Sequence, residues 1–236
     1  MITLAVPSKG RIRSDALAVL DRAGLGASAA DDRAYRAMTN QAGVEIIFMS
    51  ASEIAREVVA GGVTMGLTGL DLAWEAADEA STSGGERIQF GAASLLCRLN
   101  VGRADVVLAL PRIWFDVETM DDVADIAAEF RARHGRRLRI ATKYERLANH
   151  HLARVHGIQA FRLVPSGGAT EGAPHAGLAD AIIDITSTGS TLRANDLKVP
   201  AGGVILRSEV CLFGDPRNDE VAMIAEQITA ASQETV

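Results

Sequence analysis

The sequence predicts an α/β fold made of two lobes with mainly parallel sheets. Apolar strand-like runs alternate with helix-like patterns along almost the whole chain, as right-handed crossover connections between parallel strands require. The length of 236 residues is enough for one or two domains with cores of their own. Two long extended segments, residues 87–101 and 204–213, are the expected crossings between lobes. We therefore predict a first lobe from residues 1–100 and 190–236, and a second from residues 101–189.

The first hundred residues predict a strand followed by a helix, three times in succession. Gly24 ends the first helix, and Ser50 or Ser52 caps the second, whose first turn contains Glu53. The predicted strands are residues 2–6, 44–49 and 63–68; the helices are residues 13–23, a segment ending at residue 60, and residues 70–80. A polar, glycine-rich link over residues 81–86 follows.

The same alternation continues after the first crossing. Pro111 ends a strongly apolar strand, and a long amphipathic helix follows it. The predicted strands are residues 104–110, 138–141, 160–164, 181–185 and 204–213, and the predicted helices are residues 117–133, 144–155 and 219–231.

Composition excludes several classes of function. A net charge of −6 and an aromatic content of 4% argue against general nucleic-acid binding. No apolar run approaches the ~20 residues that span a bilayer, and the N-terminus lacks signal-peptide features, so we expect a cytoplasmic protein. Cys97 and Cys211 are predicted to be buried strand residues, too few for a structural metal site.

The most informative stretch runs from residue 179 to residue 192. An apolar strand carrying Asp180 and Asp184 turns abruptly into six small residues: Thr186, Ser187, Thr188, Gly189, Ser190 and Thr191. Hydroxyls and backbone N–H groups at the start of a helix suit a phosphate. A carboxylate does not bind phosphate, so Asp184 suits the hydroxyls of a sugar. Together they predict a ribose phosphate site; the alternative is an ordinary capped helix start.

Four further groups stand at predicted strand ends. Gly167, Gly168 and Glu171 follow the strand at residues 160–164, and glycine lets a backbone approach a ligand closely. The other groups are Lys9 with Arg11, Thr142 with Lys143, and Gly69 with Asp71. Each alone has a simple alternative, an irregular loop or a solvated charge. Together they favour a site for a nucleotide or sugar phosphate, because ligands in α/β folds bind at the carboxyl ends of strands.

Other common chemistries lack their motifs. The sequence has no P-loop and no Gly-x-Ser-x-Gly nucleophile elbow. His150 and His151 are adjacent on a predicted helix and therefore point in different directions, which argues against a two-histidine metal site.

Five segments in this order closely resemble the catalytic subunit of the ATP phosphoribosyltransferase family, short form. They are Ser-Lys-Gly-Arg-Ile at 8–12, Gly-Leu-Thr-Gly-Leu-Asp at 66–71, Arg-Ile-Ala-Thr-Lys-Tyr at 139–144, Gly-Ala-Thr-Glu-Gly-Ala-Pro at 168–174, and Asp-Ile-Thr-Ser-Thr-Gly-Ser-Thr-Leu-Arg-Ala-Asn at 184–195. The resemblance implies a periplasmic-binding-protein-like fold of type II, with the active site in the inter-lobe cleft. It also implies transfer of phosphoribosyl from phosphoribosyl pyrophosphate to N1 of ATP, the first step of histidine biosynthesis.

The resemblance also implies roles for individual residues. Asp184 would hold the ribose hydroxyls, and residues 187–191 the 5-phosphate. Arg11 and Arg36 would face the pyrophosphate, although Arg33 lies nearby in a weakly matching stretch, and Lys9 and Lys143 would add positive charge. The loop lining the same substrate would comprise Gly167, Gly168, Ala169, Thr170 and Glu171. Leu70 stands where the family often has lysine, so it receives no ligand role.

The implied partners follow from the same resemblance. Mg²⁺ would arrive bound to the substrates. A separate regulatory subunit similar to histidyl-tRNA synthetase would bind the chain, in a hetero-oligomer that contains a homodimer of it. Two other classes remain open, a solute-binding module on the same two-lobed fold and a nucleotide-sensing regulator. The first has no need of the hydroxyl-rich turn after Asp184, and the second would need a DNA-binding helix pair that the sequence does not show.

Overall fold

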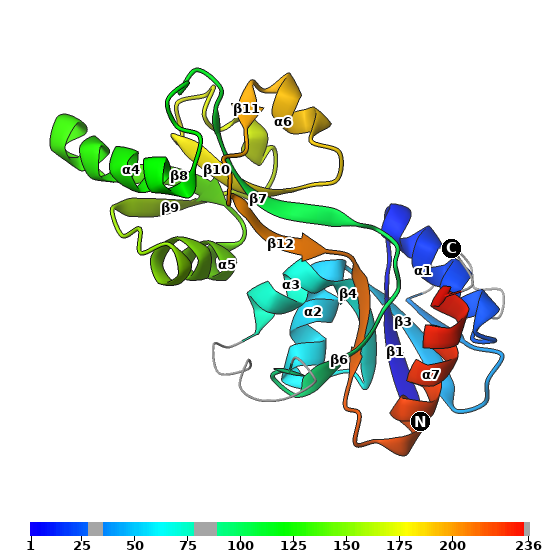
Figure 1. The fold of residues 1–236 in the computed structure, drawn as a ribbon. Helices are drawn as coiled ribbons and strands as arrows, with labels where there is room; N and C mark the ends of the chain where they lie inside the picture. The colour runs from blue at the N-terminus through cyan, green and yellow to red at the C-terminus, as the bar shows by residue number, and fades with distance from the viewer. Residues whose placement is uncertain (28–34, 78–88, 234–236) are drawn as a thin grey trace. The chain divides into compact units, whose positions relative to one another are not determined.

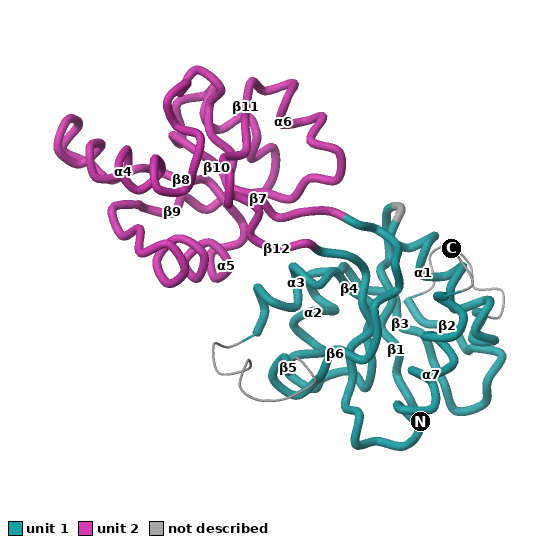
Figure 2. Tube along the Cα trace, in the orientation of Figure 1, with its two compact units in different colours: residues 1–103, 208–236 teal, residues 104–207 magenta. Residues whose placement is uncertain are grey.

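The computed structural model describes residues 1–27, 35–77 and 89–233, and the chain divides into two compact units (Figure 2). Unit 1 consists of Met1–Arg103 and Ser208–Val236, and unit 2 consists of Ala104–Arg207. Each unit has its own sheet with helices packed against it, so the predicted α/β fold with two lobes is confirmed. The predicted link at residues 81–86 lies outside the described residues.

Unit 1 is built on a seven-stranded sheet with the order β2-β3-β1-β4-β13-β6-β5. Its strands are β1 (Ile2–Pro7), β2 (Arg36–Met38), β3 (Val44–Met49), β4 (Met65–Gly69), β5 (Gln89–Phe90), β6 (Ala93–Arg98) and β13 (Val210–Gly214). Its helices are α1 (Arg11–Arg22), α2 (Ala51–Ala60), α3 (Leu70–Ala76) and α7 (Asp219–Gln233). Helices α1 and α7 pack on one face of the sheet and α2 on the other (Figure 1).

Local sequence signals explain where α2 begins and ends. The Ser50 hydroxyl accepts a hydrogen bond from the Glu53 N–H, and the Glu53 carboxylate accepts one from the Ser50 N–H, which together form a capping box. Gly61 closes the helix in the left-handed conformation at φ 78°. Of the two predicted caps, Ser50 is therefore the one used.

Unit 2 is built on a six-stranded sheet with the order β11-β7-β10-β8-β9, and β12 pairs with β7. Its strands are β7 (Ala104–Pro111), β8 (Leu138–Thr142), β9 (Phe161–Pro165), β10 (Ala181–Thr186), β11 (Leu197–Lys198) and β12 (Val204–Ser208). Its α-helices are α4 (Met120–His134), α5 (Glu145–Asn149) and α6 (Ser190–Ala194). The predicted helix at residues 144–155 is α5 continued by a π-helix, His150–Val155.

Both sheets are mixed, which corrects the prediction of mainly parallel sheets. Only β3-β1-β4 and β10-β8-β9 run parallel. Strands β13 and β6 in unit 1, and β7 and β11 in unit 2, pair antiparallel with their neighbours. The parallel strands are those joined by helices, whereas the antiparallel pairs surround the two places where the chain passes between the units.

The second boundary between the units also differs from the prediction. Residues 190–207 belong to unit 2 rather than to the first lobe. Leu192 and Leu197 lie in the core of unit 2, and β11 and β12 both pair with β7. The single strand predicted over residues 204–213 is two strands that break at Glu209, because β13 pairs instead with β4 and β6.

The two cysteines lie in buried strands, as predicted. Cys97 is in β6 and Cys211 is in β13. Burial raises the pKa of both thiols, that of Cys211 to about 12, so both stay protonated at neutral pH. Among the described residues, no helix has both the length and the apolar character needed to cross a membrane.

Candidate functional site

The hydroxyl turn, residues 186–191, follows the end of β10 in unit 2. Burial falls along the strand, from the fully buried Ile183 to the half-buried Asp184 and the exposed Ser187. Gly189 has φ 68°, a conformation that favours glycine, and its N–H donates to the Thr186 hydroxyl at 3.0 Å. The Thr188 hydroxyl donates to that of Ser190 at 2.9 Å. The turn is therefore folded by its own hydroxyls and glycine.

The start of α6 differs from an ordinary capped helix. Gly189 occupies the N-cap position, and no side chain makes a cap hydrogen bond there. The Thr188 hydroxyl, one residue before that position, accepts a hydrogen bond from the Ser190 N–H at 3.4 Å. Arg193 Nη1 donates to the Thr188 carbonyl at 3.1 Å, which places a cation beside the turn. Arg193 was not among the predicted site residues; its position four residues after Gly189, at the start of a helix, is the signal that predicts this proximity.

Asp184 lies at the centre of the unit 2 site. Its Oδ1 accepts a hydrogen bond from the Ile185 N–H at 2.8 Å. Burial raises the pKa of this carboxyl, and the nearby Glu171 carboxylate raises it further, while Lys143 and a hydrogen bond from Thr170 act in the opposite direction. These interactions bring together three groups that the sequence analysis found at three separate strand ends.

The loop after β9 supplies Thr170 and Glu171. Thr170 is buried, and its hydroxyl shares a 2.9 Å hydrogen bond with that of Ser166, whose N–H donates to the Thr142 carbonyl in β8. Ala169 has φ 50°, which is uncommon for a residue with a side chain and marks a constrained backbone. Gly167 and Gly168 have open space around them, because an added Cβ would meet no atom within 4 Å. The loop is thus anchored at Ser166 and Thr170 and open at its glycines.

Lys143 follows β8 and is exposed. Its Nζ lies 4.9 Å from the centroid of the Tyr144 ring, in a cation–π contact. The buried Thr142 hydroxyl accepts a hydrogen bond from the Tyr144 N–H at 2.9 Å, which fixes the backbone on either side of Lys143. The site in unit 2 therefore pairs a lysine with two carboxylates and a hydroxyl turn.

The remaining predicted residues belong to unit 1. Lys9 is exposed in the turn after β1, and Arg11 is the first residue of α1, which follows the left-handed Gly10. Arg36 lies opposite Ile47 on the edge strand β2, and Ile47 lies opposite Ala5 of β1, so the start of β2 is at the same sheet end as the turn after β1. Arg36 Nη1 pairs with Glu45 at 3.3 Å, and its side chain is 66% exposed. Arg33 lies outside the described residues.

Asp71 occupies a different environment from the other predicted residues. It is buried in the first turn of α3, and the Ser208 hydroxyl donates to its Oδ1 at 2.6 Å. Its own N–H donates to the Ser208 oxygen at 3.1 Å. This arrangement gives Asp71 a structural role at the point where the chain returns to unit 1, and its contact with a substrate stays a prediction.

Comparisons with known proteins identify the family. A family model described as HisG, ATP phosphoribosyltransferase, matches residues 50–233. An ATP phosphoribosyltransferase from Agrobacterium fabrum is 55% identical and covers 98% of this chain and 100% of its own length. One from Sinorhizobium fredii is 52% identical and covers 97% of each chain.

Solved structures agree on the fold. The ATP phosphoribosyl transferase (HisG:HisZ) complex from Thermotoga maritima matches with a TM-score of 0.68 at 22% identity, over 99% of this chain and 100% of that one. The arginine-bound form of truncated ArgBP from T. maritima matches with a TM-score of 0.53 at 13% identity, over 100% of this chain and 96% of that one. The predicted periplasmic-binding-protein-like fold is thereby confirmed. Because the family model spans more than half of the sequence and the relatives share more than half of its residues, the chain belongs to the HisG family of ATP phosphoribosyltransferases.

Proposed function

We propose that this chain transfers the phosphoribosyl group of phosphoribosyl pyrophosphate to N1 of ATP, giving phosphoribosyl-ATP and pyrophosphate, the first step of histidine biosynthesis. The observation that carries the proposal is the convergence of Asp184, Glu171 and Lys143 beside the hydroxyl turn in unit 2. Family membership supports the reaction, and relatives that this chain matches over their whole length support the short form.

The site offers a separate group for each part of the donor. An ionised Asp184 accepts hydrogen bonds from the ribose hydroxyls, with the buried Thr170 holding the neighbouring loop in place. The hydroxyls of residues 186–191 and the cation of Arg193 suit the 5-phosphate, and Lys143 adds positive charge. The open glycines, Gly167 and Gly168, leave room for the sugar.

The reaction needs no protein nucleophile. The lone pair of adenine N1 forms a bond to C1 of the ribose while the bond from C1 to the pyrophosphate oxygen breaks, and the transition state has the oxocarbenium character known from glycoside chemistry. Catalysis then depends on positioning and on stabilising the departing negative charge. Lys9, Arg11 and Arg36 of unit 1 are the cations that we assign to the pyrophosphate.

Local cations must overcome the net charge of the protein, which is −6. A unit ion pair at 4 Å contributes about 4 kcal/mol at an effective dielectric constant near 20, before desolvation is counted. Surface carboxylates farther away than about 8–10 Å are largely screened at physiological salt. A few close cations therefore suffice to bind two polyanionic substrates.

Mg²⁺ enters this proposal with the substrates. Among the described residues, no three side chains of His, Cys, Asp or Glu lie together in a group that would hold a metal ion. Magnesium prefers phosphate and water oxygens to an all-protein cage, so phosphoribosyl pyrophosphate and ATP are its expected carriers. We also assign the chain to the cytoplasm, as a homodimer within a hetero-oligomer that contains a regulatory subunit similar to histidyl-tRNA synthetase. The match to a HisG:HisZ complex supports this partner.

The test is direct formation of phosphoribosyl-ATP. The purified chain is mixed with ATP, Mg²⁺ and phosphoribosyl pyrophosphate, with and without the regulatory subunit encoded in the same genome. We expect product in at least one of the two mixtures and none when phosphoribosyl pyrophosphate is left out. Binding of a small solute without product in either mixture would support the solute-binding alternative and refute the proposed reaction.

A further inference from the structure

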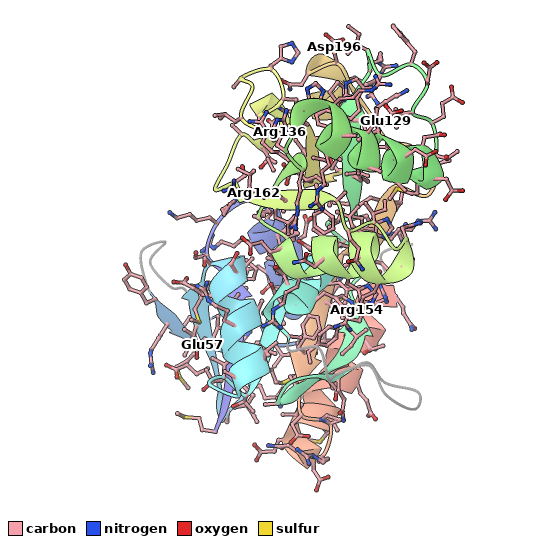
Figure 3. The ribbon with its side chains drawn as sticks, turned by 90° about the vertical axis from the view of Figure 1, so that its left-hand side faces the viewer. Glu57, Glu129, Arg136, Arg154, Arg162 and Asp196 are labelled. Carbon is pink, nitrogen blue, oxygen red and sulfur yellow. The ribbon has the colours of Figure 1, made fainter. Side chains whose placement is uncertain are left out.

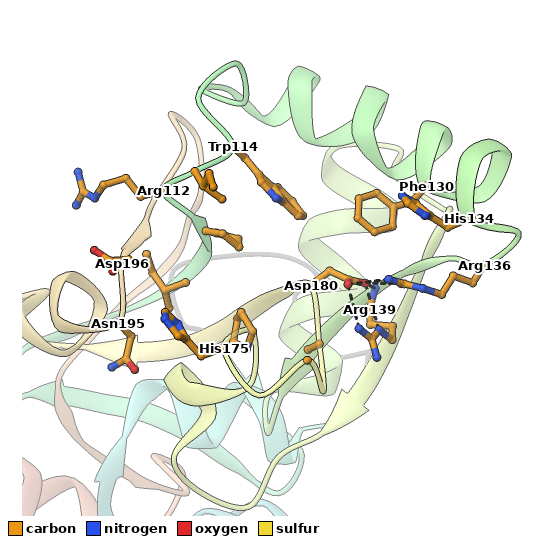
Figure 4. A pocket seen from close by; sticks show the side chains of 16 residues that line it. Arg112, Trp114, Phe130, His134, Arg136, Arg139, His175, Asp180, Asn195 and Asp196 are labelled. Carbon is orange, nitrogen blue, oxygen red and sulfur yellow. Dashed lines mark hydrogen bonds and ion pairs between the residues drawn. The ribbon is translucent and has the colours of Figure 1, made fainter.

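A groove in unit 2 lies at the opposite end of β10 from the proposed donor site. It has a volume of about 600 Å³ and runs between the segment after β7 and the segment before β10 (Figure 4). Asp180, which lines it, precedes the first residue of β10, whereas Asp184 and the hydroxyl turn stand at the strand's other end. At about 3.3 Å per residue, the six-residue strand separates the groove from that turn by roughly 20 Å. The proposed reaction therefore makes no use of this groove.

Apolar side chains are exposed along the groove. Trp114 and Phe130 line it with their ring centroids 5.7 Å apart. Three large apolar residues in the two bordering segments face solvent: Ile113 is 72% exposed, Phe115 is 73% exposed and Leu178 is 63% exposed. Clustered exposed apolar groups are typical of interaction sites, and buried aromatic anchors provide much of the affinity of protein interfaces.

The same region is strongly basic. Residues 129–139 contain five arginines against a single acidic residue, Glu129, in a chain whose net charge is −6. Asp180 pairs with both Arg136 and Arg139 (Figure 4), and Glu129 pairs with Arg133. Glu129 and Arg136 are labelled beside α4 in Figure 3. For Arg112, Arg131 and Arg137, the described part of the chain provides no acidic partner within ion-pair distance.

Stabilisation of the α4 dipole explains only part of this charge. Arg131, Arg133 and His134 lie in the last turn of α4, where cations are favourable. Arg136 and Arg137 lie beyond Gly135, which ends that helix, and Arg112 follows β7. Arg112 and Arg136 line the groove, and Arg137 borders it, so the helix end does not account for these three charges.

We propose that this groove and the exposed residues beside it in the chain together form the docking surface for the regulatory subunit, a partner that presents acidic residues around an apolar side chain. The surface comprises residues 111–115, 130–139 and 174–180, of which Phe115, Arg131 and Arg137 border the groove rather than line it. The inference rests on the proposed function for the existence of that subunit. A second copy of this chain fits less well, because a two-fold symmetric interface would bring the arginine cluster against itself. The apolar side chain of the partner packs against Trp114 and Phe130, and its carboxylates meet Arg131 and Arg137.

The test measures the dissociation constant between the full chain and the regulatory subunit encoded in the same genome. Phe115→Asp and Arg137→Glu change the proposed surface. Val155→Asp and Arg162→Glu are matched controls, since Val155 is 58% exposed, Arg162 is exposed on β9, and both belong to unit 2 outside the groove. We expect each groove variant to bind at least tenfold more weakly and each control to bind within twofold of the unchanged chain. Affinity should also fall with rising salt, and less steeply for Arg137→Glu.

Three results would overturn the inference. Equal loss in groove and control variants would place the interface elsewhere or show a general loss of folding, which circular dichroism of each variant separates. Groove variants that change only the self-association of the chain would assign the surface to a second copy. Absence of binding by the unchanged chain would remove the regulatory partner as well, while formation of phosphoribosyl-ATP by the chain alone would leave the proposed reaction standing.

Discussion

Replacing Asp180 with Asn tests whether one carboxylate holds the start of β10 to the strand beside it. The Asp180 side chain is 9% exposed and accepts hydrogen bonds from Arg136 at 2.9 Å, from Arg139 Nη2 at 3.1 Å and from the Arg139 N–H at 2.8 Å. Burial alone would raise the pKa of this carboxyl, but the two arginines hold it at about 2. Asn keeps the shape of the side chain and removes the charge.

The stability that Asp180→Asn should lose follows from the pKa of the Asp180 carboxyl. A carboxyl with a pKa of about 2 in the folded chain, against an ordinary value of 3.8, contributes roughly 2 kcal/mol to the free energy of unfolding at pH 7. Because the folded pKa is lowered, this contribution is complete above the unfolded pKa and disappears as pH falls through the folded one. The difference between the original chain and Asp180→Asn should therefore be about 2 kcal/mol at pH 7 and about 1 kcal/mol near pH 3.

Tryptophan fluorescence during urea unfolding measures this difference in unit 2 alone. The chain has two tryptophans, and Trp74→Phe removes the one in unit 1, so that Trp114 reports on unit 2. Arg162→Asn, a loss of charge at an exposed site in the same unit, is the control, and we expect it to change stability by less than about 0.5 kcal/mol. Equal stability of Asp180→Asn and the original chain at pH 7, or a difference that grows as pH falls, would refute the reasoning.

Three further variants test the proposed reaction. Asp184→Asn should raise the KM for phosphoribosyl pyrophosphate, yet increase the thermal stability of the free chain at pH 7, because burial raises the pKa of this carboxyl and its ionised form is therefore unfavourable in the fold. A change confined to the KM for ATP would disprove the ribose role. Gly189→Ala should raise the same KM through a left-handed strain of about 1–2 kcal/mol, whereas Gly135→Ala, strained alike but outside the site, should not. Arg11→Ala should lower turnover at least about tenfold, or ~1.4 kcal/mol, and unchanged steady-state rates would exclude Arg11 from the pyrophosphate site.

The features that the sequence predicts well depend on neighbours in the chain. The strand at residues 44–49 and the helix after Ser50 have the predicted positions, because apolar alternation, a capping box and a closing glycine are all local signals. The hydroxyl turn after β10 is local in the same way. The sequence predicted that this turn, Thr170 and Lys143 would lie near one another, because ligand-binding groups gather at the ends of strands. It did not predict which of these side chains would interact.

What the sequence did not predict depends on partners far along the chain. Apolar residues stand on both sides of Arg207, Ser208 and Glu209, so the sequence predicts one strand over residues 204–213. The strand breaks at Glu209, since β12 pairs with β7 while β13 pairs with β4 and β6. Asp71 meets Ser208 across 137 positions. Nothing near Asp71 in the sequence distinguishes a carboxylate that holds a strand from one that holds a substrate. The placement of residues 190–207 in unit 2 has the same origin.

Asp180 and Asp184 show why the donor site belongs at one end of β10 and not at the other. In the sequence they are two similar acids on one apolar strand. In the structure, two arginines lower the pKa of Asp180. Burial raises the pKa of Asp184, although the Ile185 N–H and Lys143 act in the opposite direction. The first carboxylate is satisfied by the protein and stabilises it. The second becomes favourable in its ionised form only when further donors arrive, and the ribose hydroxyls of a bound donor are such groups.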